Sequence, residues 1–245
     1  MLVIAEEIKE NVDQLLTDKI IDRKEHKFLS FHLNKPRVPI FYGLPKIHKV
    51  FEKIPPMRPI VSGFHSATAN LSEFIDSFLK YQARKCPSFI KDTNDFLRKL
   101  KSIGEIPTKS ILCTMDVSSL YTNIDQDEGA EACFEKLEDR KHKKVPSIIL
   151  KELILKVLNN NVFRFDNMFY RQVKGTAMGT PMAPNYSNIF MDKIEQAMIN
   201  EFYIKTGLKP LIWFRYIDDI FFIWTHGQES FDQFIQFAQN FSTSK

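Results

Sequence analysis

Three carboxylates lie at the ends of apolar runs, where burying an ionised carboxylate costs free energy unless a cation binds it. Asp116 ends an apolar run, and Asp218 and Asp219 separate the apolar runs 213–217 and 220–224. Burial disfavours an ionised carboxylate, and adjacent like charges repel each other. If the strands are neighbours in one sheet, the three side chains converge on a site for a divalent cation. Oxygen ligands without His or Cys favour Mg²⁺ or Mn²⁺ over Zn²⁺.

Such a site suits phosphoryl transfer. Two divalent ions about 3.5–4 Å apart activate an attacking hydroxyl and stabilise the leaving oxygen. The alternative is ordinary turn chemistry, because an Asp-Asp pair is common in tight turns and a strand-end Asp often caps a helix or binds an Arg. Spacing alone leaves both interpretations open.

The elements that must position these carboxylates follow from periodicity. Apolar residues at three- and four-residue steps predict helices over 71–79, 186–202, and about 127–139, 147–158 and 230–241, with Asn70 and Glu73 as a capping pair of the first. β-branched and aromatic clusters predict strands over 38–42, 111–117, 162–164, 168–172, 213–217 and 220–224. The last two strands predict a tight hairpin with both Asp218 and Asp219 at its tip. Pro55, Pro56 and Pro59 predict a turn.

Composition excludes several classes of protein. The 245 residues are 44% apolar and 26% charged, which excludes a disordered tail, and the three Cys suggest neither a disulfide framework nor a zinc site. No apolar run predicts a membrane span or a signal peptide, so we expect a soluble protein in a reducing compartment. The net charge of +4 is mild, but residues 35–58 carry six basic side chains against one acid, interleaved with aromatics. That segment could hold a polyanion.

The absence of a regular βαβ repeat predicts an α+β fold with an antiparallel sheet.

Five segments of the chain resemble motifs of a known family. Residues 214–221, Phe-Arg-Tyr-Ile-Asp-Asp-Ile-Phe, resemble the Tyr-x-Asp-Asp box of reverse transcriptases, which is motif C of the polymerase palm. Residues 116–124 resemble palm motif A and residues 174–184 resemble motif B, in the family's order. Residues 42–49 and 58–63 resemble its two fingers motifs. These motif sequences are most similar to those of the reverse transcriptases of Penelope-like retroelements, which are related to telomerase reverse transcriptase.

The resemblance covers the chain from about residue 35 to its end and implies a right-hand polymerase core. It implies an N-terminal helical segment over 1–34, a fingers-like region over 35–110 and a palm-like region over 111–245. Only 26 residues follow Asp219, so we expect the thumb to be absent and the reverse transcriptase domain to be incomplete at its C-terminal end.

The resemblance also implies roles for particular residues. Asp116 and Asp218 would be catalytic and bind two Mg²⁺ or Mn²⁺ ions, with Asp219 as a supporting carboxylate. Tyr121, five residues after Asp116, resembles the steric gate against a ribose 2′-hydroxyl, the group that distinguishes the two sugars; its alternative is a core tyrosine. Lys46 and Arg58 would meet the nucleotide triphosphate, which suits their charge.

Weaker expectations concern backbone and surface positions. Gly179 would let the backbone approach the nucleotide and Gly175 the nucleic acid; the alternative for both is turn formation. Lys49 and Lys53 would contact nucleic acid or be solvated charges of a fingers hairpin. Met178 departs from the glutamine of many retroviral enzymes. The basic run 140–144 is either a nuclear-localisation or template patch or, more commonly, a solvated turn. Most aromatic residues are expected in the core.

Two functions are therefore open. The first is an RNA-directed DNA polymerase domain of a retroelement, which uses an RNA template, a DNA primer and dNTPs. The alternative is a catalytically inactive nucleic-acid-binding remnant of a truncated retroelement. Both predict salt-sensitive nucleic-acid binding, but only the first predicts metal-dependent nucleotide incorporation. The family's need to reach chromosomal DNA implies a nuclear or cytoplasmic location.

Overall fold

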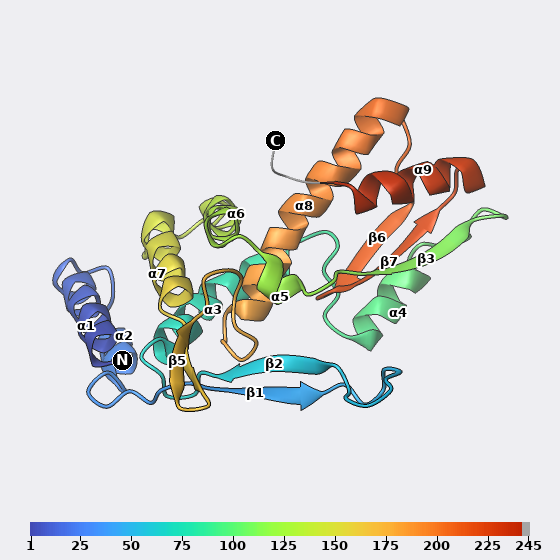
Figure 1. Ribbon diagram of the computed structural model, residues 1–245. Coiled ribbons are helices and arrows are strands. Elements are labelled where there is room, and N and C mark those ends of the chain that lie inside the picture. The colour runs from blue at the N-terminus through green and yellow to red at the C-terminus, as the bar shows by residue number, and fades with distance from the viewer. Residues whose placement is uncertain (242–245) are drawn as a thin grey trace. The chain divides into compact units, whose positions relative to one another are not determined.

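Helices and hairpin-linked strands alternate irregularly along the chain (Figure 1). A computed structural model describes residues 1–241. The helices are α1 (Leu2–Thr17), α2 (Arg23–Ser30), α3 (Ala69–Ala83), α4 (Thr93–Lys101), α5 (Leu120–Asn123), α6 (Gln126–Glu138), α7 (Ser147–Asn159), α8 (Ala183–Thr206) and α9 (Gln228–Gln239). The strands are β1 (Ile40–Pro45), β2 (Met57–Ser62), β3 (Ile111–Asp116), β4 (Val162–Phe165), β5 (Met168–Arg171), β6 (Ile212–Tyr216) and β7 (Asp219–Trp224).

These elements form two compact units, each built from two separate segments of the chain. The first unit contains residues 1–80 and 121–186, and the second contains residues 81–120 and 187–245. Each unit has its own sheet. The predicted α+β class is confirmed; the strand pairs are antiparallel except that β1 and β4 pair in parallel at Ile40 and Arg164.

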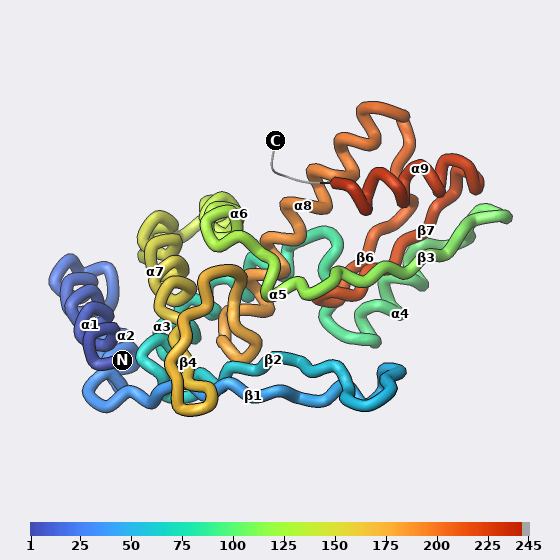
Figure 2. The backbone as a smooth tube through the Cα atoms, viewed as in Figure 1, coloured from blue at the N-terminus to red at the C-terminus, as the bar shows by residue number. Residues whose placement is uncertain are grey.

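The sheet of the first unit has the strand order β2-β1-β4-β5. Strands β1 and β2 form a long antiparallel hairpin, which Figure 2 shows as two adjacent lengths of backbone tube. Pro59 lies inside β2 opposite Gly43, so the prediction that it marks a turn is wrong. Because β2 is an edge strand, a proline that donates no hydrogen bond is tolerated there. Pro55 and Pro56 do precede the strand.

The helices of the first unit bury regular apolar stripes. In α1, the buried residues Ala5, Ile8, Val12 and Leu15 recur at three- and four-residue steps. Helices α6 and α7 pack against each other. The predicted helix over 71–79 is α3, but Asn70 is not its cap. The helix begins one residue earlier, and the Asn70 amide donates to the Phe28 carbonyl at 2.6 Å.

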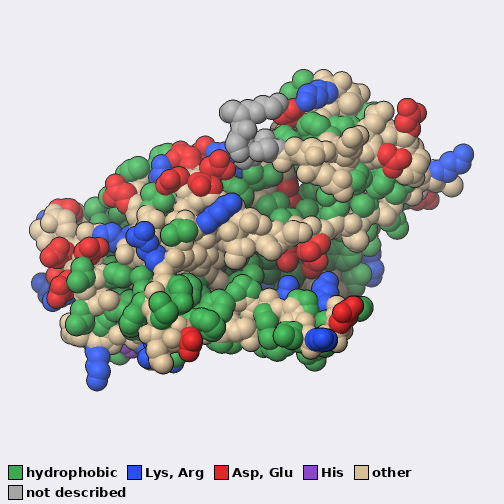
Figure 3. Space-filling view, viewed as in Figure 1, with side chains coloured by type: hydrophobic (Ala, Val, Ile, Leu, Met, Phe, Trp, Pro, Cys, Tyr) green, Lys and Arg blue, Asp and Glu red, His purple; other side chains and the backbone are tan. Residues whose placement is uncertain are grey.

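One hairpin of the first unit leaves apolar side chains uncovered. Figure 3 shows hydrophobic side chains gathered over the β4–β5 hairpin, where Phe165, Met168, Phe169 and Tyr170 are exposed. Within residues 1–241, no helix has the length and hydropathy that a membrane span requires.

The sheet of the second unit has the order β3-β7-β6, and both pairs are antiparallel. One face packs on α8 and α9 through a core that includes Phe202, Phe222, Trp224 and Phe234. The opposite face carries Phe214 and Phe221, which meet Phe96 of α4 edge-to-face. The expectation that most aromatic residues are core residues holds in this unit.

Candidate active site

The strand register brings two of the three predicted carboxylates opposite each other. Asp116, the last residue of β3, pairs with Asp219, the first residue of β7, which also pairs with Tyr216 of β6. The two-residue turn therefore consists of Ile217 and Asp218. The prediction that both adjacent aspartates lie at the hairpin tip is wrong by one position, because Asp219 already belongs to the strand.

The third carboxylate is held beside this pair through its backbone. The amide of Val117 donates to the Asp218 carbonyl at 3.0 Å, which joins the end of β3 to the turn. Residues directly opposite in an antiparallel pair share a face and interact, and like charges there are destabilising. The structure therefore meets the condition set in the sequence analysis, that β3 and the β6–β7 hairpin are neighbours in one sheet.

The carboxylates at this end of the sheet carry like charges and repel one another. Burial raises the pKa of the Asp219 carboxyl, and the nearby carboxylates of Asp218 and Asp116 raise this pKa further. A divalent cation would relieve this repulsion, and the oxygen-only donor set has the chemistry that Mg²⁺ and Mn²⁺ prefer. No three His, Cys, Asp or Glu side chains in residues 1–241 are gathered closely enough to hold an ion.

A cavity of about 800 Å³ lies beside Asp219 on the α4 side of the sheet. Its lining includes Phe96, Phe214, Tyr216 and Phe221. Because the alternation of β3 places Asp116 on the same face as Thr114, another lining residue, both carboxylates of the pair belong to this face.

A buried polar network supports the carboxylate-bearing hairpin from the opposite face. The Arg215 side chain is 0% exposed. Its Nε donates to Glu195 Oε1 at 2.8 Å, and its other nitrogens donate to Asn188 Oδ1 at 2.6 Å and to the Asn188 carbonyl at 3.0 Å. Glu195 also accepts hydrogen bonds from Ser88 Oγ at 2.7 Å and Trp213 Nε1 at 2.8 Å. The pair is thus hydrogen-bonded as well as charge-balanced, as a buried ion pair requires.

The same guanidinium reaches the turn itself. Arg215 donates to the Ile217 carbonyl at 2.9 Å. Ile217 has φ +56°, a conformation that β-branched residues rarely adopt. Since strained backbone persists only where its surroundings impose it, the Arg215 contact helps to hold the turn that carries Asp218.

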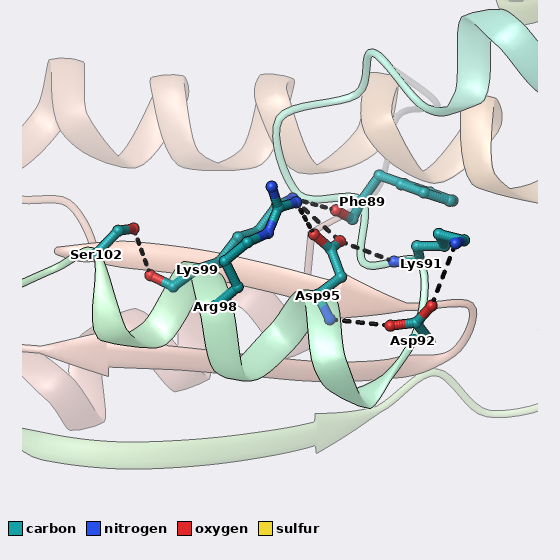
Figure 4. A network of polar contacts seen from close by, with 7 residues as sticks. All are labelled: Phe89, Lys91, Asp92, Asp95, Arg98, Lys99 and Ser102. Carbon is teal, nitrogen blue, oxygen red and sulfur yellow. Dashed lines mark hydrogen bonds and ion pairs between the residues drawn. The ribbon is translucent and has the colours of Figure 1, made fainter.

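Helix α4, which covers the carboxylate face, was not predicted from the sequence. Figure 4 shows its capping network: Asp92 accepts from the Asp95 amide at 2.9 Å, and Asp95 accepts from the Lys91 amide at 3.1 Å. Asp95 also accepts from Arg98, and Lys99 donates to the Phe89 carbonyl at 2.5 Å. The signal for this helix was present, because Asp92 followed three residues later by Asp95 resembles an N-terminal cap.

The remaining predicted residues lie in the first unit. Tyr121 is in α5, and its carbonyl accepts from the Thr176 amide at 2.7 Å, so motif A is joined to motif B. Gly175 has φ +71°, and a Cβ there would lie 2.3 Å from the Tyr121 carbonyl oxygen. Close approach to this backbone therefore requires glycine at position 175.

Gly179 has an equally tight environment. Its φ is +120°, and a Cβ would lie 2.4 Å from the Val61 carbonyl oxygen. The Val61 amide donates to the Met178 carbonyl at 3.0 Å, so motif B is also joined to β2 of the β1–β2 hairpin. Both glycines thus have structural roles within this unit.

The basic residues of the β1–β2 hairpin have no acidic partners. Lys46, Lys49, Lys53 and Arg58 lie along its strands and connection, and none of them makes an ion pair with any residue in 1–241. Lys46 is half-buried, and the other three are exposed. Exposed cations without an ion pair in the described part of the chain leave their charge available for phosphate.

The basic run 140–144 is instead engaged within the chain. Arg140 donates to the Val145 carbonyl at 2.8 Å and to Ser147 Oγ at 3.1 Å. Lys143 and Lys144 form ion pairs with Glu138 and Glu25. These contacts favour the structural interpretation of this loop.

Sequence reasoning missed the residues that support the hairpin. Asn188 and Glu195 stand in the predicted amphipathic helix over 186–202, where polar residues are expected on the solvent side. A buried Glu195 and Asn188 could be found only from their distant partner Arg215.

Comparisons with known proteins agree with this arrangement. The chain folds like telomerase of Candida tropicalis truncated from its C-terminal domain (TM-score 0.60, 10% identity, 81% of this chain and 45% of that one). It also resembles apo telomerase of Candida tropicalis (0.59, 10%, 82% and 41%) and telomerase of Candida albicans in complex with a telomeric RNA fragment (0.56, 12%, 93% and 44%). The chain thus spans less than half the length of these telomerase chains. A search of curated proteins gave no match.

These likenesses show the fold, which has the fingers and palm elements of telomerase reverse transcriptase. Independently, a family model described as reverse transcriptase (RNA-dependent DNA polymerase) matches residues 49–245. This range includes the segments that resemble palm motifs A and B and the Asp218-Asp219 box. The chain therefore belongs to the reverse transcriptase family.

Proposed function

We propose that this chain is the RNA-directed DNA polymerase domain of a retroelement, which transfers nucleotides to a primer 3′-hydroxyl on an RNA template. The observation that carries the proposal is the pairing of Asp116 with Asp219 beside the Asp218 turn, within a chain of the reverse transcriptase family. The similarity of the motif sequences to those of Penelope-like reverse transcriptases supports the retroelement context.

The proposed catalytic and metal-binding residues are Asp116, Asp218 and Asp219. When bound, two Mg²⁺ or Mn²⁺ ions would activate the attacking hydroxyl and stabilise the departing pyrophosphate. The three carboxylates supply hard oxygen ligands, and their mutual repulsion makes the site ready to accept positive charge. Arg215 and the strained Ile217 keep Asp218 at the turn.

The proposed substrate contacts come from the first unit. Lys46 and Arg58 supply unpaired positive charge for the triphosphate, and Lys49 and Lys53 supply charge for nucleic-acid phosphates. Gly179 and Gly175 keep their predicted nucleotide and nucleic-acid roles in addition to their packing roles. The assignment of residues 35–110 as fingers-like and 111–245 as palm-like belongs to the same proposal.

Primer extension tests this function. A DNA primer annealed to an RNA template is incubated with the chain, dNTPs and Mg²⁺, with an excess of chelator in the parallel reaction. We expect extension that disappears with chelator and returns when Mn²⁺ or Mg²⁺ is restored in excess. A folded chain that binds the primer–template without extending it would instead support the inactive nucleic-acid-binding remnant.

Tyr121 is expected to make the reaction selective for deoxynucleotides. Replacing its ring by a smaller side chain in Tyr121→Val opens space for a 2′-hydroxyl. We expect the preference for dNTPs over NTPs to fall roughly ten-fold or more, because sugar discrimination here depends on exclusion of that hydroxyl. Single-nucleotide incorporation with each substrate measures this ratio, and Tyr121→Phe, which retains the ring, should preserve it. Equal ratios in parent and Tyr121→Val would contradict the steric-gate role.

A further inference from the structure

Four aromatic rings from two distant segments form one column on the first unit. The ring centroids of Phe31 and His32 are 4.5 Å apart, those of His32 and His65 are 3.9 Å apart, and those of His65 and Phe64 are 3.7 Å apart. The two contacts that involve His65 are stacked, whereas the Phe31 contact is edge-to-face. We call Phe31, His32, His65 and Phe64 the aromatic column.

Both ends of the column are open to solvent. Phe31 is 67% exposed and Phe64 is 65% exposed, although both are large apolar side chains. Neither ring therefore contributes much to a core, and together they border a cavity of about 600 Å³ that Phe28, Tyr42 and Pro181 also line. Exposed apolar surface of this kind marks a contact surface.

The backbone holds the column in an unusual conformation. His65 has φ +57°, and its carbonyl accepts a hydrogen bond from the Arg37 amide at 2.9 Å. The neighbouring Ser66 amide donates to the Gly63 carbonyl at 3.0 Å, which closes a tight turn around Phe64 and His65. Non-glycine residues in the left-handed region are uncommon and cluster at functional sites.

Positive charge lies beside the rings. Arg37 and Lys35 are exposed, and neither forms an ion pair with any of residues 1–241. Burial lowers the pKa of His65, and the charges of His32 and Arg37 lower it further. The column therefore presents stacked ring faces next to cations that are free to meet an anion.

We propose that the aromatic column is a stacking surface for unpaired bases of a single-stranded nucleic acid, with Phe64 and Phe31 contacting bases and Arg37 contacting phosphate. Ring faces next to unpaired cations match the alternation of bases and phosphates in a single strand. A protein partner would need the rings only as apolar surface. The inference rests on the proposed use of an RNA template, and it assigns the unpaired part of that template a site outside the carboxylate centre.

Equilibrium binding of the full chain to a fluorescent single-stranded oligoadenylate RNA tests the proposal. We expect Phe64→Ala to weaken binding roughly ten-fold and Phe31→Ala to weaken it several-fold, since stacking on one ring contributes about that much per base. Phe64→Tyr, which keeps the ring, should bind within about two-fold of the parent. The matched control is Phe169→Ala, which removes an equally exposed phenylalanine (64%) from β5 and should leave affinity unchanged.

A second ligand separates stacking from phosphate attraction. An oligomer of the same length with abasic sugars should bind parent and Phe64→Ala equally. Arg37→Gln should weaken both ligands and reduce the dependence of binding on salt. Thermal unfolding of each variant confirms that it is folded, which is expected because the replaced side chains are exposed.

A further variant, Phe64→Leu, keeps an apolar side chain but removes the ring. Three results would overturn the proposal: equal affinities of Phe64→Ala and Phe169→Ala, parent-like affinity of Phe64→Leu, or equal loss with the abasic oligomer. Parent-like affinity of Phe64→Leu would favour an apolar protein partner. The binding assay needs neither nucleotide nor metal, so its outcome is separate from that of primer extension. Extension without ring-dependent binding would overturn only the proposed role of the aromatic column. Ring-dependent binding without extension would overturn only the proposed polymerase function.

Discussion

Asp218→Asn is expected to lower nucleotide incorporation by about a thousand-fold or more, because it removes the charge of a proposed metal ligand that would stabilise the transition state. We expect the stability of the folded chain not to decrease. Burial and the charges of Asp218 and Asp116 raise the pKa of Asp219, so ionised Asp219 is disfavoured in the folded state. Stability therefore falls as the pH rises through that raised pKa, and removing the Asp218 charge reduces this loss. At neutral pH, the midpoint of thermal unfolding should equal or exceed that of the parent.

The matched control is Asp232→Asn on α9, which also removes one carboxylate. Asp232 is exposed and, within residues 1–241, its side chain accepts only from Gln228, at 2.8 Å, so incorporation should stay within about two-fold of the parent. Added Mg²⁺ should raise the unfolding midpoint of the parent and of Asp232→Asn, but not that of Asp218→Asn. Incorporation by Asp218→Asn at the parental rate would exclude Asp218 as a catalytic ligand.

Arg215→Met is expected to lower the free energy of unfolding of the second unit by about 3–5 kcal/mol, because it leaves the buried Glu195 charge without its partner. Trp213 donates to Glu195, so denaturant unfolding followed by tryptophan fluorescence reports this region directly. The control is Arg98→Met, whose side chain is 79% exposed and should change stability by less than about 1 kcal/mol.

Two further variants separate the buried charge from the support of the turn. Adding Glu195→Gln to Arg215→Met removes the unpaired charge and should restore part of the stability. It does not restore the hydrogen bond to the Ile217 carbonyl, so incorporation should stay about ten-fold below the parent. Full recovery of both stability and incorporation in the double variant would show that Arg215 does not position the turn. A single Arg215→Met variant as stable as the parent would contradict the buried network itself.

Periodicity and the turn pattern were sufficient to predict the strands β3, β6 and β7, the long helix α8 and the hairpin. Each of these depends on local alternation or on one apolar stripe. The hairpin register was predicted wrongly, because turn preferences favour Asp over Ile at the loop positions. In the structure Ile217 takes a left-handed conformation, and the support comes from Arg215, Asn188 and Glu195. Partners 20 and 27 residues apart cannot be found from a local pattern.

Strand β2 and helix α4 illustrate a different limit. Pro59 was predicted to mark a turn because proline usually ends a strand, yet an edge strand tolerates it. Helix α4 escaped prediction because it is short, highly charged and contains no fully buried residue. Its function in the fold depends on Phe96 meeting Phe214 and Phe221, a contact that only the tertiary structure provides.

The most direct test of RNA-directed DNA synthesis is whether the RNA base chooses the nucleotide that is added. The chain is given one primer on four RNA templates that differ only in the first unpaired base, and each dNTP is supplied separately with Mg²⁺. The account predicts addition only of the dNTP complementary to that base. Addition regardless of the template base, or no addition by a folded chain bound to the primer–template, would contradict it.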